Sequence, residues 1–282
     1  MMHCFFVTDL HGKVSRYEKL FAIIRHKKPD AVFIGGDILP SLNVNEVYKG
    51  DFIEDYLSGK LKSLKSELKG HYPRIFIIMG NDDPRIEEAK VKKLEEENLW
   101  EYIHFSKTEF AGYNIFGYSY IPPTPFMLKD WEKYDVSVFV DPGCVHPVDG
   151  CRSVDPLEDI SFTNIKKDLD KIAANEDMEK AVFLFHSPPY KTVHDRAALD
   201  GKTIDHVPLD VHVGSIAIQR FIEDNQPYLT MHGHIHESAT LTERWMQNMG
   251  NTVTCSAAYD GKGLSLVSFY LEDLSTLKRE IL

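Results

Sequence analysis

The sequence predicts an α/β protein built on a largely parallel β-sheet. Over residues 4–97, three short apolar runs alternate with three amphipathic segments. This strand–helix order implies parallel strands joined by right-handed crossovers. After Trp100, shorter strand-like segments indicate additional, antiparallel pairs. The chain has 282 residues, which is long enough for one large domain with a substantial core of its own.

The elements of the first half follow from periodicity. Contiguous apolar, β-prone runs predict buried strands at Cys4–Val7, Ala31–Ile34 and Ile75–Met79. Apolar residues spaced three and four apart predict helices at Ser15–Lys27 and Asp51–Lys69. A third helix is predicted at Arg85–Glu97, because Pro84 suits a first helical turn and helix-forming residues follow it.

The second half is less regular. Two short strands are expected around Ala111-Gly112 as an antiparallel addition, at Ile103–Phe105 and Asn114–Tyr120. Helices are predicted at Phe162–Ala174 and Ser215–Glu223, and strands at Ala181–Phe185, Tyr228–Met231, Thr252–Ala257, Leu264–Leu271 and Thr276–Leu282. We interpret 121–157 and 190–214 as long loops or insertions within a single domain over residues 1–282.

Composition narrows the function classes. The formal net charge is −11, which disfavours duplex nucleic acid and anionic membranes as partners, since both are bound by clustered cations. No apolar run approaches the length of a membrane span, and the N-terminus has no basic segment of a signal peptide. The four cysteines are scattered, and reduced thiols are favoured over a Cys144–Cys151 bridge. We therefore expect a cytoplasmic location.

Side chains of the types that bind metals follow five of the predicted strands: Asp9 and His11, Asp37, Asn81 and Asp82, His186, and His234 and His236. In extended backbone, residues i and i+2 point to the same side. Asp9 and His11 can therefore reach one centre, and His234 and His236 can share one ion or straddle two. Ligands of such sheets bind beyond the carboxyl ends of the strands, where these motifs would converge.

Each motif by itself has a simpler explanation. Gly-Gly-Asp after a strand is often only a turn, and Asn81-Asp82-Asp83-Pro84 could begin a helix. His186 could be a buried histidine at the end of a strand. The run His234-Ile-His236 is harder to explain by packing, and five such motifs after five strands favour metal binding over chance.

In this order, the motifs resemble the calcineurin-like metallophosphoesterase superfamily: D-x-H at Asp9 and His11, GD at Asp37, GN at Asn81, H at His186, and GHxH at His234 and His236. The stretches His186-Ser-Pro-Pro-Tyr, His212-Val-Gly-Ser and Gly-His-Ile-His-Glu resemble its small, single-domain prokaryotic members. The resemblance implies a four-layer α/β/β/α sandwich with two mixed β-sheets.

The resemblance also implies a dinuclear metal centre. Asp9, His11, Asp37 and His236 would hold one ion; Asp37, Asn81, His186 and His234 would hold the other, with Asp37 bridging. Two divalent ions about 3.5–4 Å apart can hold a bridging hydroxide and clamp phosphoryl oxygens. Imidazole, carboxylate and amide ligands suit Mn, Fe, Zn or Ni, and we favour Mn or Fe.

The sequence departs from the family where many members follow the metal-binding asparagine with histidine. Here GNDD replaces GNH[DE], and the position holds Asp82. Nearby dications favour the charged form of Asp82, so another proton donor is needed unless the leaving group departs unaided. His194, His206 and His212 are candidates, and we rank His212 first. Arg85 and Tyr190, with Asn81, are candidate substrate-binding residues.

These observations predict a phosphoesterase that acts on a small phosphodiester or phosphomonoester, nucleotide-type esters included, through a metal-bridging hydroxide. Phosphodiesters are slightly favoured, because loss of the usual histidine should affect monoesters with poor leaving groups most. The alternatives are a non-catalytic interaction module with this fold and a protein phosphatase. A homo-oligomer is compatible with the sequence.

Overall fold

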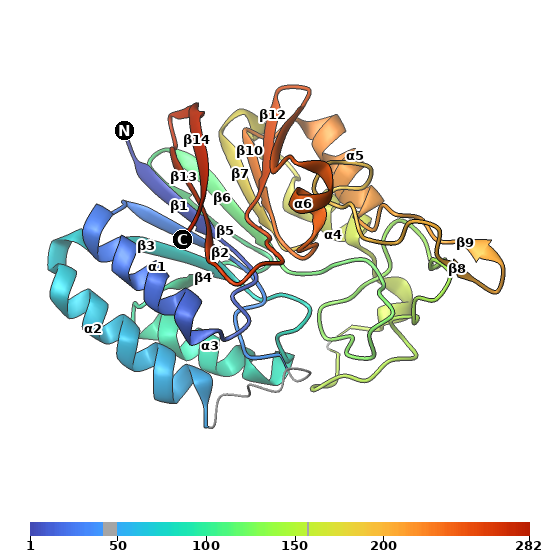
Figure 1. Cartoon of the computed structure of the whole chain (residues 1–282), viewed down its shortest axis with the longest axis horizontal. Helices are drawn as coiled ribbons and strands as arrows, with labels where there is room; N and C mark the ends of the chain where they lie inside the picture. Colours follow the sequence, from blue (N-terminus) through green and yellow to red (C-terminus); the bar gives the residue numbers. More distant parts are fainter. Residues whose placement is uncertain (42–49, 157) are drawn as a thin grey trace.

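The computed structural model describes residues 1–41, 50–156 and 158–282, and its strands form two six-stranded mixed sheets (Figure 1). The first sheet has the order β14 (Asp273–Ile281), β13 (Ser265–Tyr270), β1 (His3–Val7), β2 (Ala31–Gly35), β3 (Arg74–Ile78) and β4 (Glu101–Tyr102). The second has the order β11 (Met246–Met249), β12 (Thr252–Ser256), β10 (Leu229–His232), β7 (Ala181–Phe185), β6 (Tyr113–Tyr118) and β5 (Ser106–Phe110).

Helices cover the outer face of each sheet, which completes the predicted α/β/β/α sandwich (Figure 1). The first sheet carries α1 (Val14–Lys27), α2 (Ser58–Leu68) and α3 (Glu88–Glu96). The second carries α4 (Ile165–Ile172) and α5 (Ile216–Asn225), and α6 (Ser238–Thr242) follows β10. Shorter turns lie at Phe52–Leu57 (π), Lys69–His71, Arg85–Glu87, Ile160–Phe162 and Met178–Lys180 (3-10).

Alternation along the strands divides the core into layers, because successive strand side chains point to opposite faces. Phe6 of β1 and Phe33 of β2 point between the sheets, where they share one buried cluster with Leu184 of β7. Their neighbours point outward: Phe5 packs with Leu20 of α1. On the other sheet, the Phe183 ring lies 4.9 Å from that of Phe221 on α5.

Strand register sets the position of the site. β1, β2 and β3 are parallel and in register, with Val7 opposite Ile34, so the loops after these strands leave the same edge. β7 and β10 are parallel as well, with Leu184 opposite Met231. The loops after all five strands therefore meet at one end of the sandwich, where the predicted metal ligands lie.

One strand prediction was wrong. Residues 103–105 are not the antiparallel partner of β6; that partner is β5, Ser106–Phe110, with Phe110 opposite Tyr113. Ala111 and Gly112 both have positive φ, 52° and 80°, as a two-residue hairpin turn requires. Such a turn pairs the residues next to it, which places the strand at 106–110. β6 also pairs in parallel with β7, which the antiparallel interpretation did not include.

Other differences concern short elements and helix ends. α6, β11 and the hairpin of β8 (Thr203–Ile204) and β9 (Val207–Pro208) were not predicted, since they are too short for a periodic signal. The helix predicted from Phe162 begins at Ile165. Residues 121–156 contain no helix or strand, in agreement with the predicted loop, whose last residue, 157, lies outside the described residues.

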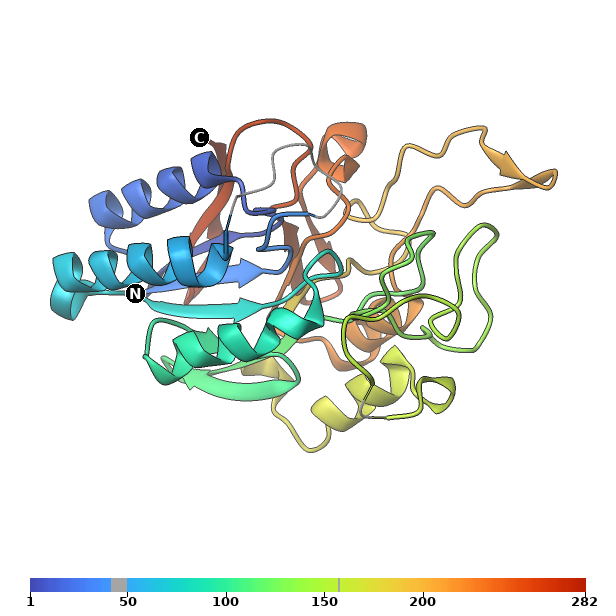
Figure 2. The same ribbon diagram turned by 90° about the horizontal axis from the view of Figure 1, so that it is seen from below.

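The two long loops extend from the same end of the sandwich, on the side that carries β8 and β9 (Figure 2). In the ranges that the structure describes, no helix combines the length and the apolar character needed to span a membrane.

Candidate metal centre and adjoining cavity

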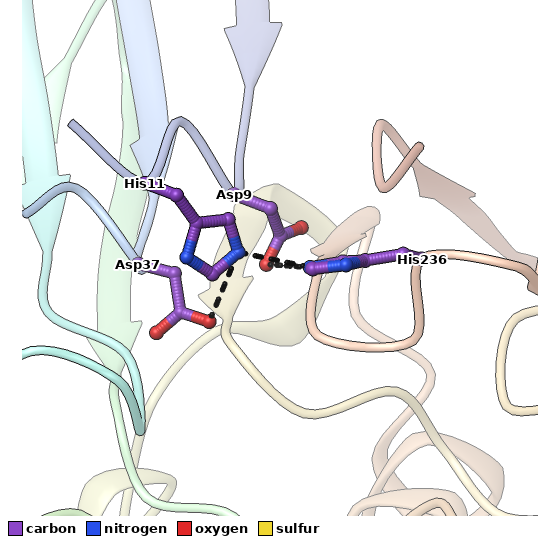
Figure 3. A group of neighbouring side chains, drawn as sticks. All are labelled: Asp9, His11, Asp37 and His236. Carbon is purple, nitrogen blue, oxygen red and sulfur yellow. Dashed lines mark hydrogen bonds and ion pairs between the residues drawn. The ribbon is translucent and has the colours of Figure 1, made fainter. Parts of the chain in front are cut away.

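Four acidic and imidazole side chains converge where β1, β2 and β10 end. One potential ligand atom each of Asp9, His11, Asp37 and His236 lies within 4.8 Å of the others. The Nε2 atoms of His11 and His236 are 3.1 Å apart. His236 Nε2 lies 3.5 Å from Asp9 Oδ1, and His11 Nε2 lies 3.8 Å from Asp37 Oδ2 (Figure 3). These are the four residues expected to hold the first ion.

The residues expected around a second ion lie beside the first group, with Asp37 common to both. His186 Nε2 is 3.4 Å from Asp37 Oδ2 and 3.0 Å from Asn81 Oδ1. The rings of His186 and His234 have centroids 5.3 Å apart. Asp37 is buried between the two groups, which is the location that a bridging carboxylate requires.

The backbone at this end of the sandwich is unusual. Asp9, His11, Asp37 and His234 have φ values of 55°, 49°, 50° and 73°. L-residues rarely adopt this region, and such strain persists only where the surrounding structure enforces it. Here, backbone hydrogen bonds from Asp9 N to Gly36 O and from His11 N to Asp37 O join the first two loops. The ligand positions are therefore held by the backbone, as a preorganised site requires.

The surroundings of His186 fit a bound cation. Its Nδ1 lies 2.8 Å from the carbonyl oxygen of Gly35, which can only accept a hydrogen bond, so Nδ1 carries the proton. Nε2 then faces oxygen atoms of Asp37 and Asn81, and a positive charge is needed between them. Burial opposes that charge, but Asp37 outweighs it and raises the pKa of His186 to about 10. A metal ion would replace this proton.

His234 is suited to metal binding for a different reason. Burial, reinforced by the charge of His186, lowers the pKa of His234 to about 3. Its imidazole is therefore neutral, which is the form that binds metals. Together, imidazole, carboxylate and amide donors without thiolate fit first-row divalent ions better than a structural zinc site.

Sequence analysis missed two residues that support this centre. Asp83, fully buried, accepts backbone hydrogen bonds from Gly80 at 2.8 Å, Leu39 at 2.8 Å and Ile38 at 3.1 Å. It thereby ties the loop after β2 to the loop after β3, and burial raises its pKa to about 8. The signal in the sequence is the second aspartate of GNDD, where the local pattern indicates only the start of a helix.

The second missed residue is Arg16 on α1. Its guanidinium donates to the carbonyl oxygens of Asp9 and Gly261 and so fastens the first ligand loop to the loop before β13. Arg16 is buried. Nothing in its local sequence distinguishes it from the other cations of a helix surface.

A cavity of about 590 Å³ adjoins the ligand groups. Asp37, Asn81, His234 and His236 form part of its wall, and the two long loops supply most of the rest. His212 and Tyr190, both predicted from sequence, line it too.

His212 has a partner that the sequence did not indicate. Its Nδ1 lies 2.8 Å from Asp195 Oδ1, and Asp195 is fully buried. Backbone N–H groups of Lys191, Thr192 and Gly214 donate to that carboxylate. Tyr190 donates its hydroxyl to Asp210 at 2.6 Å, and this hydrogen bond raises the pKa of Tyr190 to about 12.

Several predicted residues lie away from the cavity. Arg85 is not among the lining residues; its guanidinium stacks 5.1 Å from the Trp131 ring centroid and donates to Tyr120. His194 is buried against Thr254, and His206 is exposed in the β8–β9 turn. Of the three loop histidines, His212 alone lines the cavity among the described residues.

Asp82 lies beside the ligands rather than in the cavity wall. Its backbone N–H donates to Asp37 Oδ1 at 2.8 Å, and its carboxylate is 3.5 Å from His11 Nδ1. Burial, with the charge of Asp37, raises the pKa of Asp82.

Comparisons with known proteins agree with this architecture. The family model described as calcineurin-like phosphoesterase matches residues 2–238. An uncharacterized protein of Methanocaldococcus jannaschii is 39% identical over 77 residues, which are 26% of this chain and 29% of that protein. That match therefore spans less than a third of the relative's length.

Solved structures are similar over nearly their whole length. The protein TT1561 of Thermus thermophilus is 14% identical, with 99% of this chain and 98% of that chain covered and a TM-score of 0.56. Another crystal structure is 16% identical, with 100% and 98% covered and a TM-score of 0.59. At these identities, the likeness shows the fold alone.

Proposed function

Because the chain belongs to the calcineurin-like phosphoesterase family, we propose that it is a metal-dependent hydrolase of a small phosphodiester or phosphomonoester. The observation that supports this most is the position of Asp37, shared between two groups of ligand-type side chains at one end of the sandwich. A lone structural metal site would not need that second group.

Asp9, His11, Asp37 and His236 would hold one divalent ion, and Asp37, Asn81, His186 and His234 the other. When bound, such a pair supplies positive charge to the phosphoryl oxygens and activates a water molecule. We propose Mn or Fe, with Zn or Ni as alternatives. The chain itself fixes the ligands: the backbone N–H of His234 donates to both carboxylate oxygens of Asp9, at 3.1 and 3.2 Å.

His212 is proposed to protonate the leaving group. It lines the cavity together with the ligands, and Asp195 holds its Nδ1. This pairing directs Nε2 away from the Asp195 carboxylate, as a proton donor to a substrate requires. Asp82 remains a candidate for catalysis through its contact with His11, although a neighbouring dication would keep it charged. Tyr190 and Asn81 remain candidates for substrate binding; Arg85 would need to leave Trp131.

We also propose that residues 1–282 form a single domain and that the protein is cytoplasmic. The strand pairing supports one domain, because β1 pairs with β13 and β13 with β14 in the same sheet.

The test combines metal analysis with a hydrolysis assay. Purified protein should contain close to two first-row metal ions per chain, and it should hydrolyse bis(p-nitrophenyl) phosphate or p-nitrophenyl phosphate after addition of Mn²⁺. Asp37→Asn should lose both the metals and the activity, because it removes the shared anionic ligand. Asp224→Asn, an equal charge change on the exposed face of α5, is the matched control.

Two results would favour the alternatives. Near-zero bound metal and no hydrolysis with any added divalent ion would indicate a non-catalytic module. Hydrolysis of phosphopeptides in preference to every small ester would indicate a protein phosphatase.

A further inference from the structure

The cavity beside the ligand groups has an uneven distribution of charge. None of its described lining residues is Lys or Arg. The charged side chains in its wall are all acidic: Asp37, Asp135, Asp141, Asp210 and Glu237. Polyanionic ligands are bound by clustered Lys and Arg or by bidentate Arg, and this cavity supplies neither.

The rest of the wall is largely apolar and incompletely covered. Phe126, Phe139 and Ile204 line the cavity, yet they remain 55%, 85% and 38% exposed. They come from the two long loops, and Leu209 and Val136 add to the apolar lining. An apolar group that entered the cavity would cover these side chains and gain the associated free energy.

Two of the acidic lining residues are held by hydrogen bonds from neutral donors. Asp135 accepts from Ser215 and from a backbone N–H at the start of α5, and Asp210 accepts from the Tyr190 hydroxyl and from the backbone N–H of His212. Asp141 is exposed and experiences the neighbouring charge of Asp210. A further anion at this end would meet these carboxylates, and none of the described lining residues is a Lys or Arg that could bind it.

We infer that the substrate carries a single phosphate group joined to an apolar organic part with no additional negative charge. This inference rests on the proposed function, since the metal centre must take the phosphate. With Asp9 and Asp37 as the anionic ligands, two divalent ions leave a local charge of about +2, enough for one phosphate group. Nucleoside polyphosphates and sugar bisphosphates are disfavoured, because the described lining residues include no Lys or Arg for their second phosphate.

The test uses p-nitrophenyl phosphodiesters that differ only in the second ester group: methyl, hexyl and 5-carboxypentyl. All three share the leaving group and the reacting phosphate. The hexyl ester should have a kcat/KM at least about tenfold above that of the methyl ester, because its chain buries apolar surface. The 5-carboxypentyl ester should fall at least about tenfold below the hexyl ester, because its carboxylate meets Asp141 and Asp210.

Binding gives a second readout that does not depend on turnover. Hexylphosphonate should bind the metal-loaded protein more tightly than methylphosphonate in calorimetry, with a negative heat-capacity change, and 5-carboxypentylphosphonate should bind more weakly than hexylphosphonate. Asp141→Asn should reduce the discrimination between the hexyl and carboxypentyl compounds several-fold. Asp224→Asn, outside the cavity, should leave that ratio unchanged.

The outcomes separate the two proposals. If none of the three diesters and neither bis(p-nitrophenyl) phosphate nor p-nitrophenyl phosphate is hydrolysed with any metal, the proposed function fails. The inferred substrate class is wrong if the esters are hydrolysed but the carboxypentyl ester reacts as fast as the hexyl ester. It is also wrong if neither binding nor turnover depends on the length of the alkyl chain. In both cases the proposed hydrolase activity still stands.

Discussion

His212 and Asp195 form the hydrogen-bonded pair that gives the cavity its proposed proton donor. Among the described residues, Asp195 is the hydrogen-bond partner of the His212 ring, and its carboxylate contacts Nδ1. Nε2 is therefore available to a substrate. Asp195 is held in turn by three backbone N–H groups. The imidazole orientation is therefore set by the 190–214 loop itself.

His212→Gln should slow ester hydrolysis to an extent that depends on the leaving group. For an alkyl phosphate ester, whose alkoxide needs a proton, we expect kcat to fall about 10²–10⁴-fold, the range of general acid catalysis. For a p-nitrophenyl ester, whose p-nitrophenolate departs without protonation, the loss of kcat should be small. The measurement is kcat on both esters, with His206→Gln as the control, since that residue is in the same loop but outside the cavity. Equal losses on both esters would contradict the role.

Gly80 shows how closely the backbone approaches the proposed metal ligands. A Cβ atom at this position would lie 2.3 Å from Asp37 Oδ1 and 2.6 Å from His186 Cε1. Gly59 on α2, in contrast, has no neighbour within 4 Å of such an atom. One glycine is required by the site, and the other is not.

Gly80→Ala should therefore lower metal content and activity at least about tenfold, because Asp37 and His186 would have to move. Gly59→Ala should leave activity intact and raise the free energy of unfolding by up to about 1 kcal/mol through helix propensity. Metal analysis, hydrolysis and urea denaturation would check both variants. Wild-type metal content in Gly80→Ala would refute the ligand geometry.

At the level of elements, Asp135 connects the first long loop to α5. Its carboxylate accepts from Ser215 Oγ at 2.5 Å, Ile216 N at 2.7 Å and Ala217 N at 3.2 Å. Backbone N–H groups at the start of α5 thus donate hydrogen bonds to a residue about 80 positions earlier in the chain. Because Asp135 also lines the cavity, this connection holds one wall in place.

Asp135→Ala should lower the free energy of unfolding by about 1–2 kcal/mol, as the loss of a helix cap does. It should also raise KM more than it lowers kcat, because the wall loosens while the metal ligands remain. Asp159→Ala is the control, since Asp159 accepts a backbone N–H at the Ile160–Phe162 turn outside the cavity. Urea denaturation and steady-state kinetics give the two readouts; an unchanged KM would contradict the connection.

At the scale of the whole molecule, two buried histidines outside the metal centre link stability to pH. His104 packs 4.9 Å from the Trp131 ring and accepts a hydrogen bond from Ser119 N. Burial lowers the pKa of His104 and of His194 well below the ordinary value, and Arg85, Lys133 and Lys92 add to the effect at His104. Both are neutral in the folded chain.

The unfolded chain therefore binds more protons at these positions once the pH falls below about 6.5. The free energy of unfolding should decrease as the pH falls from about 6.5 to 5, by up to about 1.4 kcal/mol per pH unit for each histidine. His104→Asn and His194→Gln should each make this dependence shallower, whereas exposed His26→Asn should not. Urea denaturation at several pH values tests this; an unchanged slope in both buried variants would refute it.

The strands that carry the candidate site, and the residue types that follow them, could be predicted from the amino-acid pattern. Buried parallel strands are continuous apolar runs, so β1, β2, β3, β7 and β10 could be predicted within a residue or two. Local spacing also identified Asp9, His11 and Asp37. The prediction of a strand at 103–105 was wrong, because the two-residue turn, and not apolar character, decides which residues pair with β6.

Which of these side chains come together depends on how the chain packs in three dimensions. Asp9 and His236 are more than 200 residues apart in the chain, and the packing of two sheets brings them together. Side-chain direction likewise depends on neighbours from distant segments: Arg85 stacks on Trp131, while Asp195 orients His212. The apolar, acidic cavity formed by the two long loops has no local signature, because each loop contributes only part of its wall.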